Sequence, residues 1–243
     1  MTALNAKRRR ILLTGGTSGI GLELIRRWGA RHDIVTTGRS LSDDLAALLE
    51  NRPGITHAVA DQAKPMEAAS RIAEAIEARG WETLDHAVLN AGTGFAGDPA
   101  SEDIDRLLET LDTNLTAAMV LAHRLFPLLE KGRGTLTLIG STAHRGAPGF
   151  ASYAASKAGL NGFARSLREE WRGRIIVQVL HPGPTRTMMH RKAGLDTGRA
   201  GAFFTPPSAM AAMIDHAIAR RVAGRRLSFL RYWSGESLLA RGL

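Results

Sequence analysis

A regular alternation of short apolar runs with longer helical stretches is the feature that most constrains the fold of this chain. The apolar runs have no polar face, which is typical of strands buried on both sides of a parallel sheet. Predicted strands lie at 9–14, 33–37, 55–60, 84–89, 134–140, 174–180 and 226–231, and predicted helices at about 19–31, 41–50, 65–79, 102–131, 152–172 and 206–222. The pattern predicts an α/β fold, a doubly wound parallel sheet of seven strands with helices on both faces.

No linker, repeat or low-complexity segment interrupts this pattern, so residues 1–243 are expected to form a single domain around one core. The absence of cysteine excludes disulfides and thiolate metal sites, and it fits a reducing cytoplasm. No apolar run approaches the roughly 18 residues of a membrane span, and the run 11–13 is too short for a secretory signal. We expect a cytoplasmic protein without a membrane partner.

A glycine-rich turn, Thr14-Gly-Gly-Thr-Ser-Gly-Ile-Gly21, follows the first predicted strand and opens the first predicted helix. Glycine lets the backbone approach a pyrophosphate closely, and a helix N-terminus offers unpaired N–H groups with a partial positive charge. No Lys-Ser or Lys-Thr follows the glycines, which excludes a Walker-type loop. The turn is therefore predicted to bind a dinucleotide through Gly15, Thr17, Ser18, Gly19, Ile20 and Gly21.

The end of the second predicted strand, Thr36-Thr37-Gly38-Arg39-Ser40, bears on which dinucleotide is bound. An acidic residue is expected at this point when the ribose carries a free 2′-hydroxyl. Glycine stands there instead, and the arginine that follows can hold a 2′-phosphate with two hydrogen bonds. We expect NADP(H) to be favoured, with Arg39 and Ser40 near the phosphate, while NAD(H) stays possible. The alternative is that Arg39 is an ordinary surface-loop residue.

Further motifs occur in the order and spacing of one family. The set resembles the short-chain dehydrogenases/reductases, from the first strand to about residue 187, in Thr14-Gly-x-x-x-Gly-x-Gly21, Asn90-Ala-Gly92, Asn114, Ser141, Tyr153-x-x-x-Lys157 and Pro182-Gly-x-x-x-Thr187. The resemblance implies a Rossmann-type fold. It also implies an oxidoreductase that interconverts a carbonyl and a secondary alcohol by hydride transfer with a nicotinamide cofactor.

The same resemblance implies roles for individual residues. Tyr153 would be the general acid/base, and Lys157 would hydrogen-bond the nicotinamide ribose and lower the pKa of the phenol. Ser141 would hydrogen-bond the substrate carbonyl, and Asn114 would hold a water of the proton relay. Further cofactor contacts would be Asp61 and Gln62 at the adenine, Asn90, Ala91 and Gly92 at a ribose, and Pro182, Gly183, Thr185 and Thr187 near the nicotinamide. The chain departs from the family's usual pattern at Leu89, often asparagine, and at Gln62, usually aliphatic, which adjoins the expected adenine contact Asp61.

Electrostatics supports the pairing of Tyr153 with Lys157, which share a helix face at i and i+4. A tyrosine must lose about three pKa units, roughly 4 kcal/mol, to act as a base at neutral pH. A cation about 5 Å away, at an effective dielectric constant of about 20, supplies roughly 3 kcal/mol. We therefore expect Lys157 to lower the pKa of Tyr153, with an oxidised nicotinamide completing the shift. Most Tyr/Lys pairs at this spacing only form a solvated helix face, which is the alternative.

A small-molecule carbonyl or alcohol is the expected substrate, although the sequence does not identify it. Candidate substrate contacts are Thr93, His144, Phe150 and Met188. The segment 188–205 resembles the family's mobile substrate lid. A strip of small residues, Ala154, Ala158 and Gly162, is suited to packing against a second copy of the same helix, and the family commonly assembles in this way. We expect a homodimer or homotetramer.

Two other functions remain as alternatives. The same fold can bind a dinucleotide without turnover, as a sensor or scaffold. The formal charge of +9 could attract nucleic acid, but the basic residues are scattered, with no recognition-helix or zinc-finger pattern, so no nucleic-acid partner is expected. The eight histidines show no metal-binding spacing, and no metal is expected.

Overall fold

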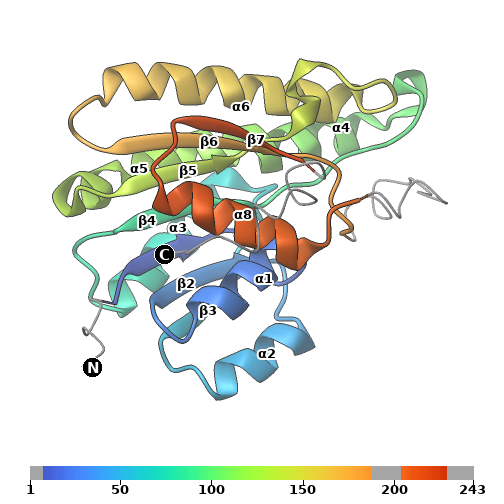
Figure 1. The fold of residues 1–243 in the computed structure, drawn as a ribbon. Coiled ribbons are helices and arrows are strands. Elements are labelled where there is room, and N and C mark those ends of the chain that lie inside the picture. Colours follow the sequence, from blue (N-terminus) through green and yellow to red (C-terminus); the bar gives the residue numbers. More distant parts are fainter. Residues whose placement is uncertain (1–7, 188–203, 229–243) are drawn as a thin grey trace.

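A parallel sheet of seven strands forms the centre of the protein, seen here in a computed structural model that describes residues 8–187 and 204–228 (Figure 1). The strand order is β3-β2-β1-β4-β5-β6-β7, and each neighbouring pair is parallel. The strands are β1 (Arg10–Leu13), β2 (Asp33–Gly38), β3 (Ile55–Val59), β4 (His86–Leu89), β5 (Thr135–Ile139), β6 (Ile176–Pro182) and β7 (Gly224–Leu227). The predicted fold class is confirmed. The last strand begins at Gly224 rather than 226, because Gly224 pairs with Val179.

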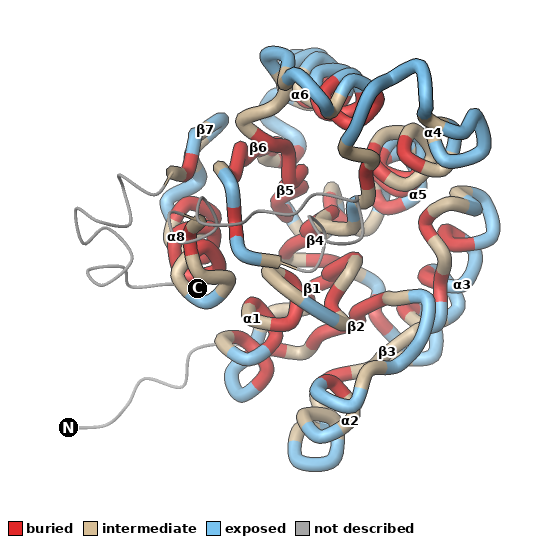
Figure 2. Tube along the Cα trace, turned by 90° about the vertical axis from the view of Figure 1, so that its right-hand side faces the viewer, coloured by how far each residue is buried: buried red, intermediate tan, exposed pale blue. Residues whose placement is uncertain are grey.

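Helices cover both faces of the sheet, as the pattern predicts (Figure 1). One face is covered by α1 (Gly19–Trp28), α2 (Asp43–Glu50) and α8 (Pro207–Ala219), and the other by α3 (Pro65–Ala78), α5 (Ala117–Gly132) and α6 (Ala151–Glu170), with α4 (Ile104–Leu111) beside α6. Alternation along β1 explains the two layers, since Ile11 and Leu13 join one hydrophobic cluster and Leu12 joins the other. Figure 2 shows the buried residues following the strands, with the outer sides of the helices exposed.

The predicted helix 102–131 is wrong as a single element. It is divided into α4, a π-helical turn at Asp112–Thr116, and α5, and residues 102 and 103 precede it. In the turn, the backbone N–H of Ala117 bonds to the carbonyl of Asp112, five residues back. The extra residue turns Asn114 into the interior, where its side chain holds the backbone of Thr93. The helical periodicity of the sequence does not predict such a turn.

A buried polar contact joins α1 to α8. The indole nitrogen of Trp28 donates to Asp215 at 2.9 Å, and Arg27 bonds the same carboxylate at 3.2 Å. Both Trp28 and Asp215 are fully buried, so the carboxylate charge is compensated within the interface. This contact fixes α8 on the helix that begins at the glycine-rich turn.

The two ends of the segment that the structure leaves undescribed between β6 and α8 meet at the carboxyl side of the sheet. Thr185 and Thr205 form an isolated parallel bridge. The backbone N–H of Arg186 donates to the carbonyl of Thr205, and that of Thr205 donates to the carbonyl of Pro184, each at 3.0 Å. The described chain before this segment and the described chain after it are therefore joined by backbone contacts.

No helix within the described ranges has the length and apolar character needed to cross a membrane. The same ranges contain no group of three or more histidine, aspartate or glutamate side chains placed to hold a metal ion.

Candidate active site

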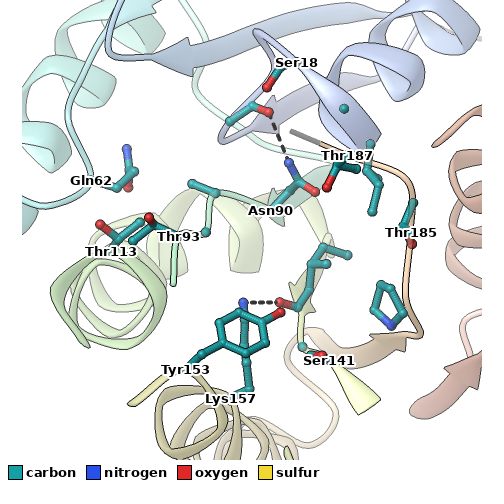
Figure 3. Close-up of a pocket in the computed structure, with 18 of the residues that line it drawn as sticks. Ser18, Gln62, Asn90, Thr93, Thr113, Ser141, Tyr153, Lys157, Thr185 and Thr187 are labelled. Carbon is teal, nitrogen blue, oxygen red and sulfur yellow. Dashed lines mark hydrogen bonds between the residues drawn. The ribbon is translucent and has the colours of Figure 1, made fainter. Parts of the chain in front are cut away.

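The carboxyl ends of the strands open into a cleft of about 510 Å³ beside β1 (Figure 3). The order in which strands are added reverses here, because β2 and β3 lie on one side of β1 and the strands from β4 onward lie on the other. Open α/β sheets bind ligands at such a switch point. Most of the residues predicted to hold a cofactor line the cleft, namely Gly15, Thr17, Ser18, Gly19, Ile20, Arg39, Asp61, Gln62, Asn90, Ala91, Gly92, Tyr153, Lys157, Pro182, Gly183, Thr185 and Thr187.

Four predicted site residues do not line this cleft, and a fifth cannot be placed. Gly21 packs beneath the turn, Ser40 is exposed to solvent, and Asn114 lies behind the lining. His144 stacks on another imidazole instead of facing the cleft. Met188 lies outside the described residues, as does most of the segment predicted to be a lid.

The glycine-rich turn depends on the absence of side chains at two positions. Gly15 has a φ of 71°, and a Cβ there would lie 2.9 Å from the Cα of Ala91. A Cβ on Gly21 would lie 2.1 Å from the carbonyl oxygen of Gly15. These two glycines let α1 and the end of β4 close tightly on the turn, which leaves its backbone facing the cleft.

Thr14 and Asn90 hold the ends of β1 and β4 together. The Thr14 hydroxyl accepts hydrogen bonds from the backbone N–H groups of Asn90 and Ala91, at 2.9 and 3.0 Å. The Asn90 side chain donates to the carbonyls of Thr14 and Gly15, at 3.1 and 3.2 Å (Figure 3). The amide of Asn90 thus supports the turn directly, in addition to lying beside the cleft.

Arg39 lies at one rim of the cleft and faces a residue that the sequence did not single out. Its guanidinium donates to the carboxylate of Glu109 on α4, at 3.5 Å, and both side chains are exposed enough for solvent to weaken the pair. Glu109 and Thr113 line the cleft, because the α4 region lies opposite the end of β2. These two residues can be identified as part of the cleft only from the position of α4 in the folded protein.

The end of β3 contributes Asp61 and Gln62. Asp61 accepts a hydrogen bond from the backbone N–H of Ala63 at 3.1 Å. Gln62 is 6% exposed, and neither atom of its amide has a hydrogen-bond partner among the described residues. An unpaired buried amide is costly, so this position is unusual for a stable interior.

Three side chains predicted to be catalytic meet at the opposite end of the cleft. Tyr153 and Lys157 project from the same face of α6, and Ser141 follows β5 (Figure 3). All three are buried, at 8%, 3% and 9% exposure. Lys157 donates to the carbonyl of Ile139 at 2.9 Å, and its Nζ lies 5.8 Å from the centre of the Tyr153 ring. The structure therefore brings these groups together as the sequence predicts.

The predicted direction of the Tyr153 pKa is wrong for the cofactor-free protein. Burial raises the pKa of Tyr153, and a hydrogen bond with Ser141 opposes this rise only in part. Burial also lowers the pKa of Lys157 to about 8. Desolvation has the larger effect here, because both groups are buried, and the spacing of Tyr153 and Lys157 in the sequence indicates only the attraction between their charges. The phenol is therefore protonated at neutral pH.

Asn114 occupies the π-helical turn and is 2% exposed. Its amide nitrogen donates to the carbonyl of Thr93 and the hydroxyl of Ser156, each at 2.9 Å. Its oxygen accepts from the backbone N–H of Thr93 at 2.8 Å. Both N–H groups are thus used, and one acceptor position remains on the oxygen.

Two of the predicted substrate residues line the cleft. Thr93 is held by Asn114, and Phe150 lies edge-on to Tyr153 with ring centres 6.3 Å apart. The loop after Ser141 adds lining residues that the sequence did not predict, namely Thr142, Ala143, Gly146 and Ala147. These side chains are small, so this end of the cleft is bounded largely by backbone.

Comparison with known proteins agrees with this geometry. The family model described as short chain dehydrogenase matches residues 9–198. An uncharacterized oxidoreductase of Mycobacterium tuberculosis is 34% identical over 196 residues, which cover 76% of this chain and 77% of that protein.

Solved structures show the same arrangement. A short chain dehydrogenase from Burkholderia cenocepacia in complex with NADP is 26% identical, with a TM-score of 0.79 and coverage of 91% of this chain and 96% of that one. A short-chain dehydrogenase from Sphingobium yanoikuyae in complex with NADPH shares the fold at 24% identity and the same TM-score, covering 94% of this chain and 92% of that one. The extent of these matches, together with the site, shows that the chain belongs to the short-chain dehydrogenase family of NAD(P)-dependent oxidoreductases.

Proposed function

We propose that this protein is an NADP(H)-dependent oxidoreductase that interconverts a small carbonyl compound and a secondary alcohol. The observation that carries the proposal is the meeting of Tyr153, Ser141 and Lys157 at one end of a cleft whose other end is a glycine-rich turn. A bound nicotinamide would supply or accept the hydride. The residues of the chain would then orient the substrate and move the proton.

In the reductive direction, the substrate carbonyl would accept hydrogen bonds from the hydroxyls of Ser141 and Tyr153. As hydride adds to the carbonyl carbon, negative charge develops on the oxygen, and Tyr153 gives that oxygen its proton. Because burial raises the pKa of Tyr153, the phenol is in the protonated form that this step needs at neutral pH. We propose reduction of a carbonyl as the direction of the reaction, because NADPH is the favoured cofactor.

Lys157 would serve both the cofactor and the proton transfer. Its ammonium lies on the same helix face as Tyr153, and one of its three donors already binds Ile139. The remaining donors can reach a ribose hydroxyl at the base of the cleft. The positive charge also stabilises the phenolate that forms after the proton has left.

The residues of the cleft fit a dinucleotide. The turn at Gly15 offers backbone to a pyrophosphate, and Arg39 offers a cation to a 2′-phosphate at the rim. No carboxylate stands at Gly38 to favour a free 2′-hydroxyl, although Glu109 approaches from the opposite side. The Burkholderia relative in complex with NADP supports the same choice. NADP(H) is therefore favoured, and NAD(H) stays possible.

A turnover assay tests the proposal. Purified protein is incubated with NADPH or NADH and a panel of ketones, aldehydes and sugars, and loss of the reduced-nicotinamide absorbance is followed. We expect reduction of at least one carbonyl compound, with a higher kcat/KM for NADPH. Tight dinucleotide binding with no turnover of the carbonyl or alcohol panel would favour the sensor or scaffold alternative. Binding of DNA that weakens steeply with salt would favour the nucleic-acid alternative.

Assembly and location stay predictions. Ala158 and Gly162 are exposed on α6, and Ile104 and Leu108 are exposed on the neighbouring α4. This face is suited to a second copy of the chain, and we propose a homodimer or homotetramer, which light scattering on the purified protein would test. The cytoplasm is the location that we propose, and fractionation of the source cells would test it.

A further inference from the structure

Two imidazole rings converge on the backbone carbonyl of Ser141. The Nδ1 atom of His144 lies 2.7 Å from this oxygen, and the Nδ1 atom of His181 lies 3.2 Å from it. The rings are stacked, with centres 4.0 Å apart and planes at 26°. His144 belongs to the short 3-10 helix after Ser141, and His181 belongs to β6. The carbonyl of one candidate catalytic residue is thus held from two separate elements.

The proton arrangement of this pair follows from the acceptor. A carbonyl oxygen only accepts hydrogen bonds, so each Nδ1 atom must carry a hydrogen. The backbone N–H of His144 adds a further bond to the same oxygen, at 3.1 Å. The pKa of His181 is lowered to about 4, first by burial and then by His144, Arg226 and Lys157. Its ring is therefore neutral at physiological pH.

The surrounding backbone is shaped to admit the His181 ring. A Cβ on Gly140 would lie 2.5 Å from the Nδ1 atom of His181, so only glycine leaves the ring its place. His181 is 6% exposed, and Val177 and Val179, which share its face of β6 by the alternation of the strand, belong to a hydrophobic cluster. A histidine therefore occupies a position where an aliphatic side chain would be the ordinary choice.

The carbonyl lies on the residue whose hydroxyl faces the chemistry. Ser141 Oγ accepts from the backbone N–H of Ala143 at 3.2 Å, and Ser141 lines the cleft together with Tyr153. Rotation of the peptide that follows Ser141 would move the serine side chain relative to the phenol. Displacements of this kind, by about 1 Å, can cost on the order of 100-fold in rate.

We propose that His181, with His144 stacked on it, is a positioning residue for Ser141. The pair fixes the Ser141 carbonyl and so holds its hydroxyl at the distance from Tyr153 that the substrate oxygen requires. This inference rests on the proposed role of Ser141. It adds a second layer of residues to the site, neither of which lines the cleft.

Two substitutions of similar size separate positioning from packing. In His181→Asn, the amide nitrogen lies close to the place of Nδ1 and keeps the donor, whereas His181→Leu removes it. We expect His181→Leu to lower kcat by about 10- to 100-fold, with the Kd for NADPH unchanged, and His181→Asn to stay within about threefold of the original protein. Equal loss in both variants, or full activity in His181→Leu, would overturn the proposal.

A double-variant cycle with Ser141→Ala measures the coupling between His181 and Ser141, which a purely structural role of His181 would not produce. If His181 acts through the serine, His181→Leu should lower kcat much less in the Ser141→Ala background than in the original protein. Independent, multiplicative losses would contradict the inference. A Ser141→Ala variant with full activity would overturn the proposed function itself. Loss in Ser141→Ala with no loss in His181→Leu would overturn only the positioning role.

His144 provides the same test if His181→Leu does not fold. His144 is half-buried on a surface 3-10 helix, so its substitution is easier to accommodate. We expect His144→Phe, which keeps the stacking and loses the donor, to lower kcat by about 3- to 10-fold. The variant His144→Asn, which keeps a donor, should retain most of the original kcat. Equal activity in His144→Phe and the original protein would then overturn the proposal.

Discussion

The guanidinium of Arg39 lies 3.5 Å from the carboxylate of Glu109, across the rim of the cleft where a 2′-phosphate would enter. A phosphate at this point would have to compete with the carboxylate for the same donors. We therefore expect Glu109, and not only Arg39, to influence the preference between the two dinucleotides.

Replacing Glu109 by glutamine is expected to strengthen binding of NADPH relative to NADH by about threefold. The change frees Arg39 and removes a negative charge beside the phosphate, while NADH has no phosphate there to respond. Fluorescence titration with both dinucleotides gives the two Kd values.

Glu82→Gln is a matched control, because Glu82 also forms a surface ion pair, with Lys131 at 2.7 Å, and does not line the cleft. It should leave both Kd values unchanged. If Glu109→Gln strengthens the binding of NADPH and NADH equally, Glu109 repels the negative charge that both dinucleotides carry and does not act on the 2′-phosphate.

Substitution of Tyr153 by phenylalanine should lower turnover by more than about 100-fold while NADPH still binds. Phenylalanine keeps the ring in its packing against Phe150 and removes only the group that moves the proton. Steady-state rates and NADPH titration on the same preparation check this. Retention of more than about one per cent of the rate would exclude the acid/base role.

Gln62→Leu is expected to raise the Tm of the cofactor-free protein by a few degrees. The substitution removes a buried amide that has no partner among the described residues and replaces it with a side chain of similar size. Differential scanning fluorimetry without dinucleotide measures the change.

Gln178→Leu is the matched comparison, since the Gln178 amide is buried and bonded to Thr137, Ala217 and Val222. That variant should have a lower Tm. A lower Tm in Gln62→Leu as well would mean that the Gln62 amide is satisfied in solution.

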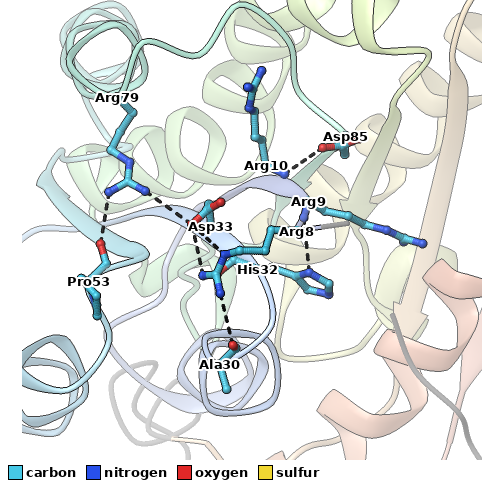
Figure 4. Close-up of polar contacts among 9 residues, drawn as sticks. All are labelled: Arg8, Arg9, Arg10, Ala30, His32, Asp33, Pro53, Arg79 and Asp85. Carbon is cyan, nitrogen blue, oxygen red and sulfur yellow. Dashed lines mark hydrogen bonds and ion pairs between the residues drawn. The ribbon is translucent and has the colours of Figure 1, made fainter. Parts of the chain in front are cut away.

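Protonation of His86 should contribute to the pH dependence of the free energy of unfolding. Burial, with Arg9 and His32 nearby, lowers the pKa of His86 to about 3, against an ordinary value of 6.5. Figure 4 shows Arg9 beside His32, to whose ring its backbone N–H is bonded. Between these pH values the unfolded chain holds a proton on this ring that the folded chain lacks, so the free energy of unfolding rises with pH. It is expected to fall as the pH drops from about 6.5 towards 3.

Urea unfolding of His86→Gln across this range isolates the contribution, because glutamine can accept from Arg9 and does not titrate. The variant should lose less stability on acidification than the original protein. Parallel curves for the two proteins would place the acid sensitivity elsewhere, with His181 the next buried histidine to test.

Local patterns predicted the sheet, the glycine-rich turn and the meeting of Tyr153 with Lys157, because each depends on spacing along one or two elements. The local order of residues, an apolar run followed by spaced glycines, is enough to predict the strand at Arg10–Leu13 and the turn after it. Contacts between distant elements could not be predicted in this way. Glu109 reaches Arg39 only because α4 packs opposite β2, and His181 meets His144 only because β5 and β6 are neighbours.

The π-helical turn and the pKa of Tyr153 were missed for a different reason. The local sequence does not distinguish Asn114 from the helical residues around it. The contact that holds its side chain inward is with Thr93, which lies 21 residues away. For Tyr153, the spacing along the sequence indicates the attraction of Lys157 but not the depth at which the two groups are buried. Desolvation is set by the whole packed structure, so its size is not available from spacing.

The bridge between Thr185 and Thr205 has a practical consequence for engineering the protein. A stretch whose ends are already tied together can change in length at small cost to the rest of the fold, about 0.6 kcal/mol for each doubling. Because the described residues on either side of positions 188–203 are joined through their backbones, exchange of these positions for the corresponding stretch of a relative is expected to leave Tyr153 and the glycine-rich turn as they are.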